Sequence, residues 1–269
     1  TGGFLTCAIE YVRKHHRGTV EDERRLQESI FGIEKKPLPH LLATTNMILH
    51  GLDVPTNVRH DNTLARPLRD YGPKDRVDVI LTNPPFGGME EDGIESNFPA
   101  AFRTRETADL FLVLIMHLLK DGGRAAVVLP DGTLFGEGIK TRIKEQLLET
   151  CNLHTVVRLP NGVFNPYTGI KTNLLFFTKG TPTEDVWFYE HPYPPDYKNY
   201  SKTHPMRIEE FAAEKAWWNA REESEYAWKV SAADIRARNY NLDIKNPHTA
   251  DVESHDPDEL LAAYADLQG

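Results

Sequence analysis

Cysteine is nearly absent from this sequence. The 269 residues contain only Cys7 and Cys151, which lie far apart in the chain. Two isolated cysteines form neither a disulfide framework nor the paired spacing of a zinc site. The adjacent His15 and His16 would not share one face of a helix as metal ligands. We therefore expect a protein of a reducing cytoplasm and assign no metal.

The sequence also lacks a long apolar run. The longest, LFLVLIM, is far shorter than the roughly 20 apolar residues that a membrane-spanning helix needs. The first ten residues, TGGFLTCAIE, lack the basic and apolar regions of a secretory leader. From these two absences we expect no association with a membrane.

An excess of basic charge is absent as well. The net charge is −9, and residues 181–269 carry 18 acidic and 9 basic side chains while the remainder is neutral. Phosphate contacts dominate the affinity of proteins for nucleic acid, so an acidic chain is not expected to bind DNA strongly by itself. If the protein acts on nucleic acid, we expect something other than this chain to supply most of the affinity.

No segment of 20–50 residues repeats, which excludes a solenoid. Strand-like and helix-like apolar patterns instead alternate up to about residue 160, which predicts an α/β fold with a mostly parallel sheet. We expect helices at 4–16, 37–51, 108–123 and 138–150, and strands at 29–34, 57–60, 77–82, 124–130, 154–160 and 173–180. The strand at 77–82, VDVILT, is apolar enough to be buried on both faces.

The last two predicted strands are joined by NGVFNPYTGIKT, which is too short for a crossover helix. This favours an antiparallel hairpin at the edge of the sheet. Beyond it the chain is irregular and rich in Pro and Tyr, with an acidic helix predicted at 207–223 and a capped helix at 256–268. We therefore divide the chain into a domain of residues 1–180 and an acidic C-terminal appendage of residues 181–269.

A polar segment follows the strand at 77–82: Asn83, Pro84, Pro85 and Phe86. In open α/β sheets, ligands bind at the carboxyl ends of the strands. The exocyclic amine of a base is a poor nucleophile, and acceptors on the Asn83 side chain and the Pro84 carbonyl would favour the tetrahedral nitrogen that attacks a methyl group. Phe86 can stack on a base removed from the duplex. Asn and Pro are also common turn formers, but the place after a buried strand favours the catalytic interpretation.

Three other segments are typical of a nucleotide site. The glycine pair in TGGF lets the backbone approach a ligand where a helix begins. Glu34, at the end of a strand, can bond both hydroxyls of a ribose. Asp61 or Asn62, after a further strand, can meet an adenine ring. Each segment has an ordinary alternative. TGGF could simply start a helix, Glu34 could be a solvated charge, and Asp61–Asn62 could form an Asx turn.

Together these segments resemble the methylation subunit of type I restriction–modification systems. The similar stretches, in chain order, are TGGFL, FGIEKKPLPHLLATTNMILHG, DNTL, DVILTNPPFGG, GGRAAVVLPDGTLFG and VVRLPNGVFNPYTGIKTNLLFFTKG. They cover roughly residues 1–180, and EYAWKVSAADIRARNYNLDIKNP extends the similarity. As a set, these motifs are highly specific.

The resemblance implies the class I methyltransferase fold and the methylation of adenine N6 in DNA with S-adenosyl-L-methionine. It implies that the target adenine is flipped out and that a specificity subunit and a restriction subunit are partners. No metal is implied. It implies that Thr1, Gly2 and Gly3 belong to the cofactor loop, that Glu34 belongs to the ribose site, and that Asn83, Pro84, Pro85 and Phe86 form the catalytic motif. The full set of cofactor candidates also includes Phe4, beside this loop, and Asp61 and Asn62.

The chain departs from the family at its start. The family places an acidic residue, a proline and a glycine before TGGF, on the first strand of the sheet, and a helical domain before that. Here the sequence begins at Thr1. We therefore expect a truncated domain that lacks its first strand. As an isolated chain it should bind S-adenosylmethionine weakly or not at all and should be inactive, and a low-micromolar affinity by calorimetry would refute this expectation.

Several alternatives remain open. Other methyltransferases with an NPP motif act on RNA guanine or protein glutamine, and a methyltransferase-like scaffold could bind a partner without catalysis. In the connection 161–172, Phe164 and Tyr167 either pack near the target-base pocket, as the resemblance implies, or anchor the turn. The terminal helix docks on a partner or folds back on its own domain. The DNA recognition sequence is expected to reside in another subunit.

Overall fold

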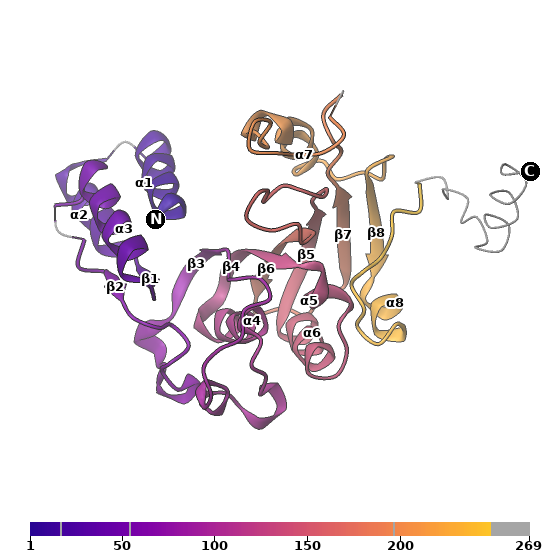
Figure 1. Cartoon of the computed structure of the whole chain (residues 1–269), viewed down its shortest axis with the longest axis horizontal. Coiled ribbons are helices and arrows are strands. Elements are labelled where there is room, and N and C mark those ends of the chain that lie inside the picture. The colour runs from indigo at the N-terminus through magenta and orange to yellow at the C-terminus, as the bar shows by residue number, and fades with distance from the viewer. Residues whose placement is uncertain (17, 54, 196, 249–269) are drawn as a thin grey trace, which may run out of the picture.

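The computed structural model describes residues 1–16, 18–53, 55–195 and 197–248 (Figure 1). The predicted helix at 256–268 lies outside these ranges. Two groups of elements follow one another along the chain: a small N-terminal group on a two-stranded sheet, and a larger group on a six-stranded sheet. The connections also contain short 3-10 helices at Leu68–Asp70, Pro73–Asp75, Ile94–Asn97, Ala100–Phe102 and Ile208–Phe211.

The N-terminal group packs three helices against a short parallel sheet, seen in indigo and violet in Figure 1. Its core is formed by apolar side chains from each helix and from the second strand, among them Ile9, Leu26, Met47 and Val58. The elements are α1 (Gly3–His15), α2 (Val20–Ser29), β1 (Gly32–Glu34), α3 (Pro37–Leu49) and β2 (Val58–His60).

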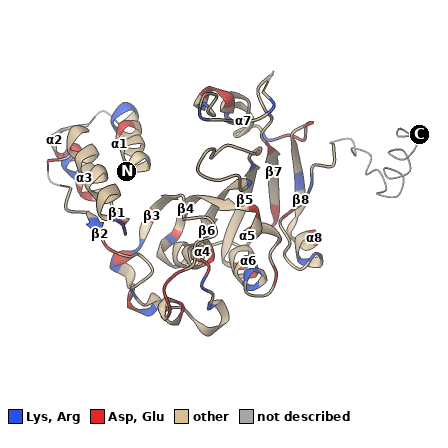
Figure 2. Cartoon of the chain, viewed as in Figure 1, with Lys and Arg blue, Asp and Glu red and all other residues tan. Residues whose placement is uncertain are grey.

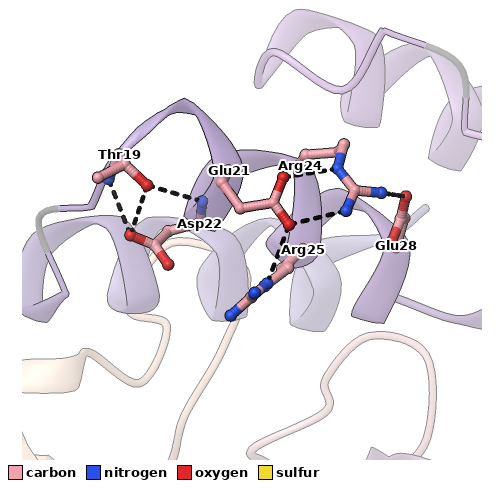
Figure 3. Close-up of polar contacts among 6 residues, drawn as sticks. All are labelled: Thr19, Glu21, Asp22, Arg24, Arg25 and Glu28. Atoms are coloured by element: carbon pink, nitrogen blue, oxygen red, sulfur yellow. Dashed lines mark hydrogen bonds and ion pairs between the residues drawn. The ribbon is translucent and has the colours of Figure 1, made fainter.

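Helix α2 is the one element of this group that the apolar pattern did not predict. It buries a single side chain, Leu26, so it has no apolar stripe to reveal it. Its stability comes instead from polar contacts on its surface (Figure 3). Thr19 and Asp22 form a capping box, and Arg24 bonds Glu21 one turn away. Such contacts satisfy the free N–H groups at a helix start and stabilise an exposed helix by tenths of a kcal/mol each, roughly.

The large sheet has the strand order β3-β4-β6-β5-β7-β8. Strands β3, β4, β5 and β7 run in one direction, while β6 and β8 run in the other. The sheet is therefore mixed but mostly parallel, and the α/β class predicted from the sequence is confirmed. The bounds are β3 (Val77–Thr82), β4 (Leu119–Pro130), β5 (Cys151–Arg158), β6 (Thr172–Lys179), β7 (Asp185–Glu190) and β8 (Ala227–Ser231).

The predicted antiparallel hairpin is present, since β5 and β6 pair along their whole lengths. Its predicted place at the sheet edge is wrong. Strand β6 lies between β4 and β5, and β7 pairs parallel with β5 on the other side. The antiparallel edge strand is β8, which comes from the segment after residue 180. That segment therefore extends the same sheet, while the proposed domain division at residue 180 stays a prediction.

One face of the sheet is covered by helices (Figure 1). These are α4 (Thr107–Leu118), α5 (Asp131–Phe135), α6 (Ile139–Thr150) and α8 (Ala232–Ala237). Alternate residues of the strands pack against them in the largest core cluster. Helix α4 ends earlier than predicted because β4 already begins at Leu119, where LKDGGRAAVVLP forms one long strand.

The other face is covered near β5, β6 and β7 by the connection after β5 and by α7 (Ala212–Trp217). Here Trp217 and Trp218 pack edge-on against aromatic rings of the strands. Helix α7 is much shorter than the acidic helix predicted at 207–223, although a 3-10 helix precedes it. Its tryptophans thus serve packing, as aromatic side chains with a large apolar area commonly do.

Strand β3 was predicted to be buried, and this prediction is wrong for the structure as described. Val79 and Leu81 expose 48% and 43% of their surfaces. The physical reason is that β3 hydrogen-bonds to β4 alone among the described strands and forms an edge of the large sheet. In the described part of the chain, no helix has the length and apolar character to cross a membrane.

Candidate active site

The carboxyl ends of the parallel strands meet at one edge of the large sheet. Asn83 follows β3, Asp131 follows β4, and Arg158 and Glu190 end β5 and β7. Ligands of open α/β sheets bind at this edge. The structure thus brings the predicted catalytic segment into line with polar residues from three other strands.

The segment from Asn83 to Phe86 combines exposed and buried positions. Asn83 and Pro85 are exposed, Pro84 is buried and Phe86 is half-buried. Among the described residues, neither the Asn83 side chain nor the Pro84 carbonyl has a hydrogen-bond partner. The proline ring fixes the direction of the backbone at Pro84. The Asn83 side-chain oxygen and the Pro84 carbonyl oxygen are both available to accept hydrogen bonds from a ligand.

The backbone after Phe86 packs closely on the start of α4. A Cβ added at Gly88 would lie 3.1 Å from the Thr107 Oγ1 and 3.5 Å from the Pro85 Cβ. The Thr107 N–H donates to the Gly88 carbonyl at 2.9 Å. Helix α4 therefore supports the backbone after the candidate catalytic segment and leaves the Asn83 side chain and the Pro84 carbonyl without a partner among the described residues.

The ring of Phe86 contacts the ring of Phe164, which lies in a different connection of the chain. The rings of Phe86 and Phe164 lie 5.4 Å apart between centroids, at 72° to one another. Edge-to-face pairs of this kind are favourable. Phe164 belongs to the connection between β5 and β6, so that connection lies beside the candidate catalytic segment.

A polar network that the sequence did not reveal lies further along the same edge. Asn173 donates from Nδ2 to Asp131 at 2.6 Å, and Arg158 pairs with Asp243 at 2.5 Å and lies 3.9 Å from Asp131. The Arg158 Nε and the Asn173 Oδ1 are buried and have no partner among the described residues. The spacing of residues in the sequence does not reveal these contacts, because the partners of Asp131 come from distant segments.

Beyond this network the edge is hollowed into a pocket of about 550 Å³. Its walls come from the ends of β5 and β7 and from the segments that follow them. The lining residues include Arg158, Asn161, Lys171, His191, Tyr193 and Tyr226. Basic and acidic side chains both line it, so it has no strong charge of one sign.

The predicted cofactor residues gather in the N-terminal group. Gly2 caps α1 with φ +81°, and a Cβ there would lie 3.2 Å from the Ala43 Cα. The Asn46 side chain donates to the Thr1 carbonyl at 2.8 Å and ties this turn to α3. A Cβ at Gly3 would meet nothing within 4 Å, so the backbone there is open to a ligand.

The remaining cofactor candidates lie at the ends of β1 and β2. These strands pair in register from Gly32 to Glu34, so Glu34 and Asp61 are close, and the Asp61 N–H donates to the Glu34 carbonyl at 3.1 Å. The Glu34 carboxylate binds the Lys36 N–H with one oxygen at 2.9 Å. The Asn62 side-chain oxygen caps its own turn by accepting from the Leu64 N–H at 3.0 Å, the Asx turn that the sequence left open.

One buried carboxylate links the two groups of residues. Glu90, which is 8% exposed, accepts hydrogen bonds from Lys35 at 3.2 Å, Asn62 at 3.3 Å and Thr107 at 3.3 Å. Lys35 and Asn62 belong to the candidate cofactor region, whereas Thr107 supports the catalytic segment. Sequence reasoning missed Glu90, because an acidic residue in a glycine-rich loop looks like a solvated charge.

Buried charges also stabilise the helices behind the site. Burial raises the pKa of Asp109, and Lys140, at 2.5 Å, opposes this rise. Burial lowers the pKa of Lys144 to about 8, and its Nζ donates to the Leu134 and Gly136 carbonyls at 2.6 and 2.9 Å. These groups point into the protein and hold α4, α5 and α6 together.

The residues of the N-terminal group fit a nucleoside cofactor. The open space at Gly3 admits a ligand against the backbone, and Glu34 keeps one carboxylate oxygen free of described partners for ribose hydroxyls. Asp61 and Asn62 lie at the end of the adjacent strand, where a purine would extend. Within the described ranges, no three His, Cys, Asp or Glu side chains are arranged to hold a metal ion.

Comparison with known proteins agrees with this geometry. The family model described as N-6 DNA Methylase matches residues 1–256. The chain belongs to the N-6 DNA methylase family. The resemblance seen in the sequence is confirmed by this match and by the type I methylase subunits described next. The class I methyltransferase fold is confirmed by solved structures with the same fold.

Individual family members are similar to the chain over most of its length. The methylase subunit of the type I restriction enzyme EcoEI from Escherichia coli is 66% identical, over 100% of this chain and 56% of its own length. The EcoKI methylase subunit of Escherichia coli K12 is 36% identical, over 71% of this chain and 38% of its own. A modification subunit of a putative type I restriction enzyme from Vibrio vulnificus has a solved structure with a TM-score of 0.88 and 51% identity, over 94% of this chain and 55% of its own.

The chain spans about half the length of the curated relatives that it matches. The relatives therefore establish the family and the fold of the matched part.

Proposed function

We propose that this chain is the catalytic part of a DNA methyltransferase that modifies adenine at N6. The observation that carries the proposal is the position of Asn83, whose exposed amide follows β3 with no internal partner among the described residues. Its side-chain oxygen and the Pro84 carbonyl accept the two hydrogens of the target amine. These acceptors favour the tetrahedral nitrogen that attacks a methyl group, because charge develops there in the transition state.

The target adenine is flipped out of the duplex to reach these acceptors. Phe86 covers one face of the base, and its edge contact with Phe164 keeps the phenyl ring in place. Pro85 is exposed beside them and completes the wall of the site. The chemistry consists of orientation and electrostatic stabilisation and needs no covalent intermediate.

S-adenosyl-L-methionine, when bound, supplies an electrophilic methyl group. The turn at Thr1–Phe4 approaches it through the open backbone at Gly3. Glu34 binds the ribose hydroxyls, and Asp61 and Asn62 contact the adenine. Glu90 fixes Asn62 relative to the catalytic segment through its hydrogen bonds on both sides.

The partners follow from the charge of the chain and from its relatives. A net charge of −9 does not favour tight binding of DNA by this chain alone. A specificity subunit therefore supplies the recognition sequence and most of the affinity, and a restriction subunit joins the same complex in the cytoplasm. The type I methylase subunits among its relatives support this assignment.

The test uses the complete product of the gene that encodes this chain, assembled with its specificity subunit. Tritiated S-adenosylmethionine is supplied with target DNA, and the DNA is then digested to nucleosides. We expect the label in N6-methyladenine. Cofactor binding without transfer would support a non-catalytic scaffold instead, and label in RNA or protein would contradict the assignment of DNA as substrate.

A further inference from the structure

The connection of residues 159–171, between β5 and β6, is held firmly although it has no regular structure. Asn165 donates from Nδ2 to the Tyr200 carbonyl at 3.1 Å, and the Tyr193 hydroxyl donates to the Asn161 carbonyl at 2.9 Å. The Phe86–Phe164 ring contact holds its middle against the candidate base site. These contacts tie the loop to residues 193–200 and to Phe86.

One side chain of the loop does not take part in this anchoring. Tyr167 is 92% exposed, and its ring has no aromatic or cationic partner among the described residues. Its backbone N–H donates to the Phe164 carbonyl at 2.8 Å, so a tight turn separates the two. Their Cα atoms therefore lie within about 7 Å of one another. Phe164 anchors the turn through its contact with Phe86, whereas the ring of Tyr167 is almost fully exposed.

The composition of the loop suits contact with DNA. Its sequence, LPNGVFNPYTGIK, contains no acidic residue and one basic residue, Lys171, in a chain of net charge −9 (Figure 2). A DNA backbone can approach this surface without meeting a carboxylate of the loop. Ile170, three residues further along the loop, is 42% exposed and adds apolar surface to it.

We propose that Tyr167 inserts its ring into the DNA duplex and occupies the stacking space that the target adenine leaves. The inference rests on the proposed function and adds a residue to it. Removal of a base from the helix costs stacking and pairing energy, and an inserted side chain that stacks on the neighbouring base pair offsets part of this cost. Tyr167 is one turn away from the ring that contacts Phe86, so the wedge and the base site are held by the same loop.

The experiment compares two duplexes in the complete gene product assembled with its specificity subunit. In one duplex the target adenine is paired with thymine, and in the other it faces an abasic position and is already unpaired. Tyr167→Ala should reduce methylation of the paired duplex about tenfold or more, since stacking on one base is worth roughly that factor. The same variant should methylate the unpaired duplex within about twofold of wild type.

Two further variants control for trivial effects. Tyr167→Phe keeps the ring and should retain activity on the paired duplex. Tyr11→Ala removes another exposed tyrosine, 62% exposed on α1, and should leave both duplexes unaffected. A 2-aminopurine placed at the target position should gain less fluorescence with Tyr167→Ala than with wild type, because fewer bases are extruded.

An equal loss on both duplexes, or no loss on either, would overturn the role of Tyr167. Loss of the specificity subunit from the Tyr167→Ala complex in gel filtration would mean that the ring contacts protein and would also overturn it. If wild type itself methylates neither duplex, the proposed function fails, which is a different outcome from a failure of the wedge alone.

Discussion

Glu90 and Asn62, 28 residues apart in the chain, are joined by a hydrogen bond of 3.3 Å from the Asn62 amide to the Glu90 carboxylate. The other carboxylate oxygen of Glu90 accepts from Thr107 at the start of α4. A single buried side chain thereby connects the candidate cofactor region with the helix that supports the catalytic segment. Under the proposed function, this connection couples the positions of the methyl donor and the target base.

Replacement of Glu90 should disturb both sides of that connection. Glu90→Ala removes three hydrogen bonds from a nearly buried position, which should lower the free energy of unfolding by about 1–3 kcal/mol. With Asn62 released, the affinity for S-adenosylmethionine should fall about tenfold. Urea unfolding and calorimetry on the complete gene product measure the two effects.

The neighbouring Glu91 provides a matched control. It also lies near Lys35, at 3.3 Å, but its side chain is 78% exposed. An exposed ion pair contributes at most about 1 kcal/mol, so Glu91→Ala should change little. If the two variants behave alike, the bridging role of Glu90 is wrong.

The two glycines that open α1 should respond differently to alanine. Gly2 has φ +81° and faces the Ala43 Cα at 3.2 Å, so Gly2→Ala should destabilise the N-terminal group by about 1–2 kcal/mol. Gly3 has open space and a helical position, so Gly3→Ala should leave stability unchanged or raise it slightly.

Cofactor affinity separates a structural role of Gly3 from a binding role. The added methyl group of Gly3→Ala occupies the space that we assign to S-adenosylmethionine, so calorimetry on the complete gene product should show weaker binding. An unchanged affinity would remove Gly3 from the cofactor site, whatever the stability of the variant.

His154 should make the fold sensitive to acid. Burial, with the Arg221 guanidinium, lowers the pKa of His154 from its usual 6.5 to about 4. Between these values the unfolded chain binds a proton that the folded chain does not, so this contribution to stability falls as the pH decreases from 6.5 to 4. The side chain is only partly buried, and solvent screening reduces the effect to about 1–2 kcal/mol.

Urea unfolding at pH 7 and pH 5 measures this loss. His154→Gln should show a smaller decrease in stability over the interval, because glutamine does not titrate. Lys229→Gln, on the exposed surface of β8, serves as a control for removal of a different polar group. An identical pH dependence in wild type and His154→Gln would show that other groups cause the decrease.

The sequence predicted those parts of the fold whose signals are local. The strand before Asn83 spans six residues, and the helix from Pro37 to Leu49 spans thirteen. The apolar pattern of each element is therefore visible in a short stretch of sequence. The hairpin of β5 and β6 was predicted from the short connection alone. The site residues at strand ends followed from the general position of ligands in α/β sheets.

What the sequence did not predict depends on contacts between distant segments. Strands β7 and β8 flank a segment rich in Pro and Tyr. Strand β7 is defined by its pairing with β5, and β8 by its pairing with β7. Glu90 is buried because Asn62 and Thr107 surround it. The exposure of Val79 reflects which strands neighbour β3, a property of the sheet and not of the local pattern.

The account depends most directly on the amide of Asn83. Methyl transfer by Asn83→Ala should be measured in the complete gene product with its specificity subunit, together with S-adenosylmethionine affinity. Asn57→Ala, which removes an amide bound to the Glu28 carbonyl in the N-terminal group, serves as the matched control. We expect transfer to adenine to be lost in Asn83→Ala, with cofactor affinity near that of wild type. Turnover close to the wild-type rate would contradict the mechanism.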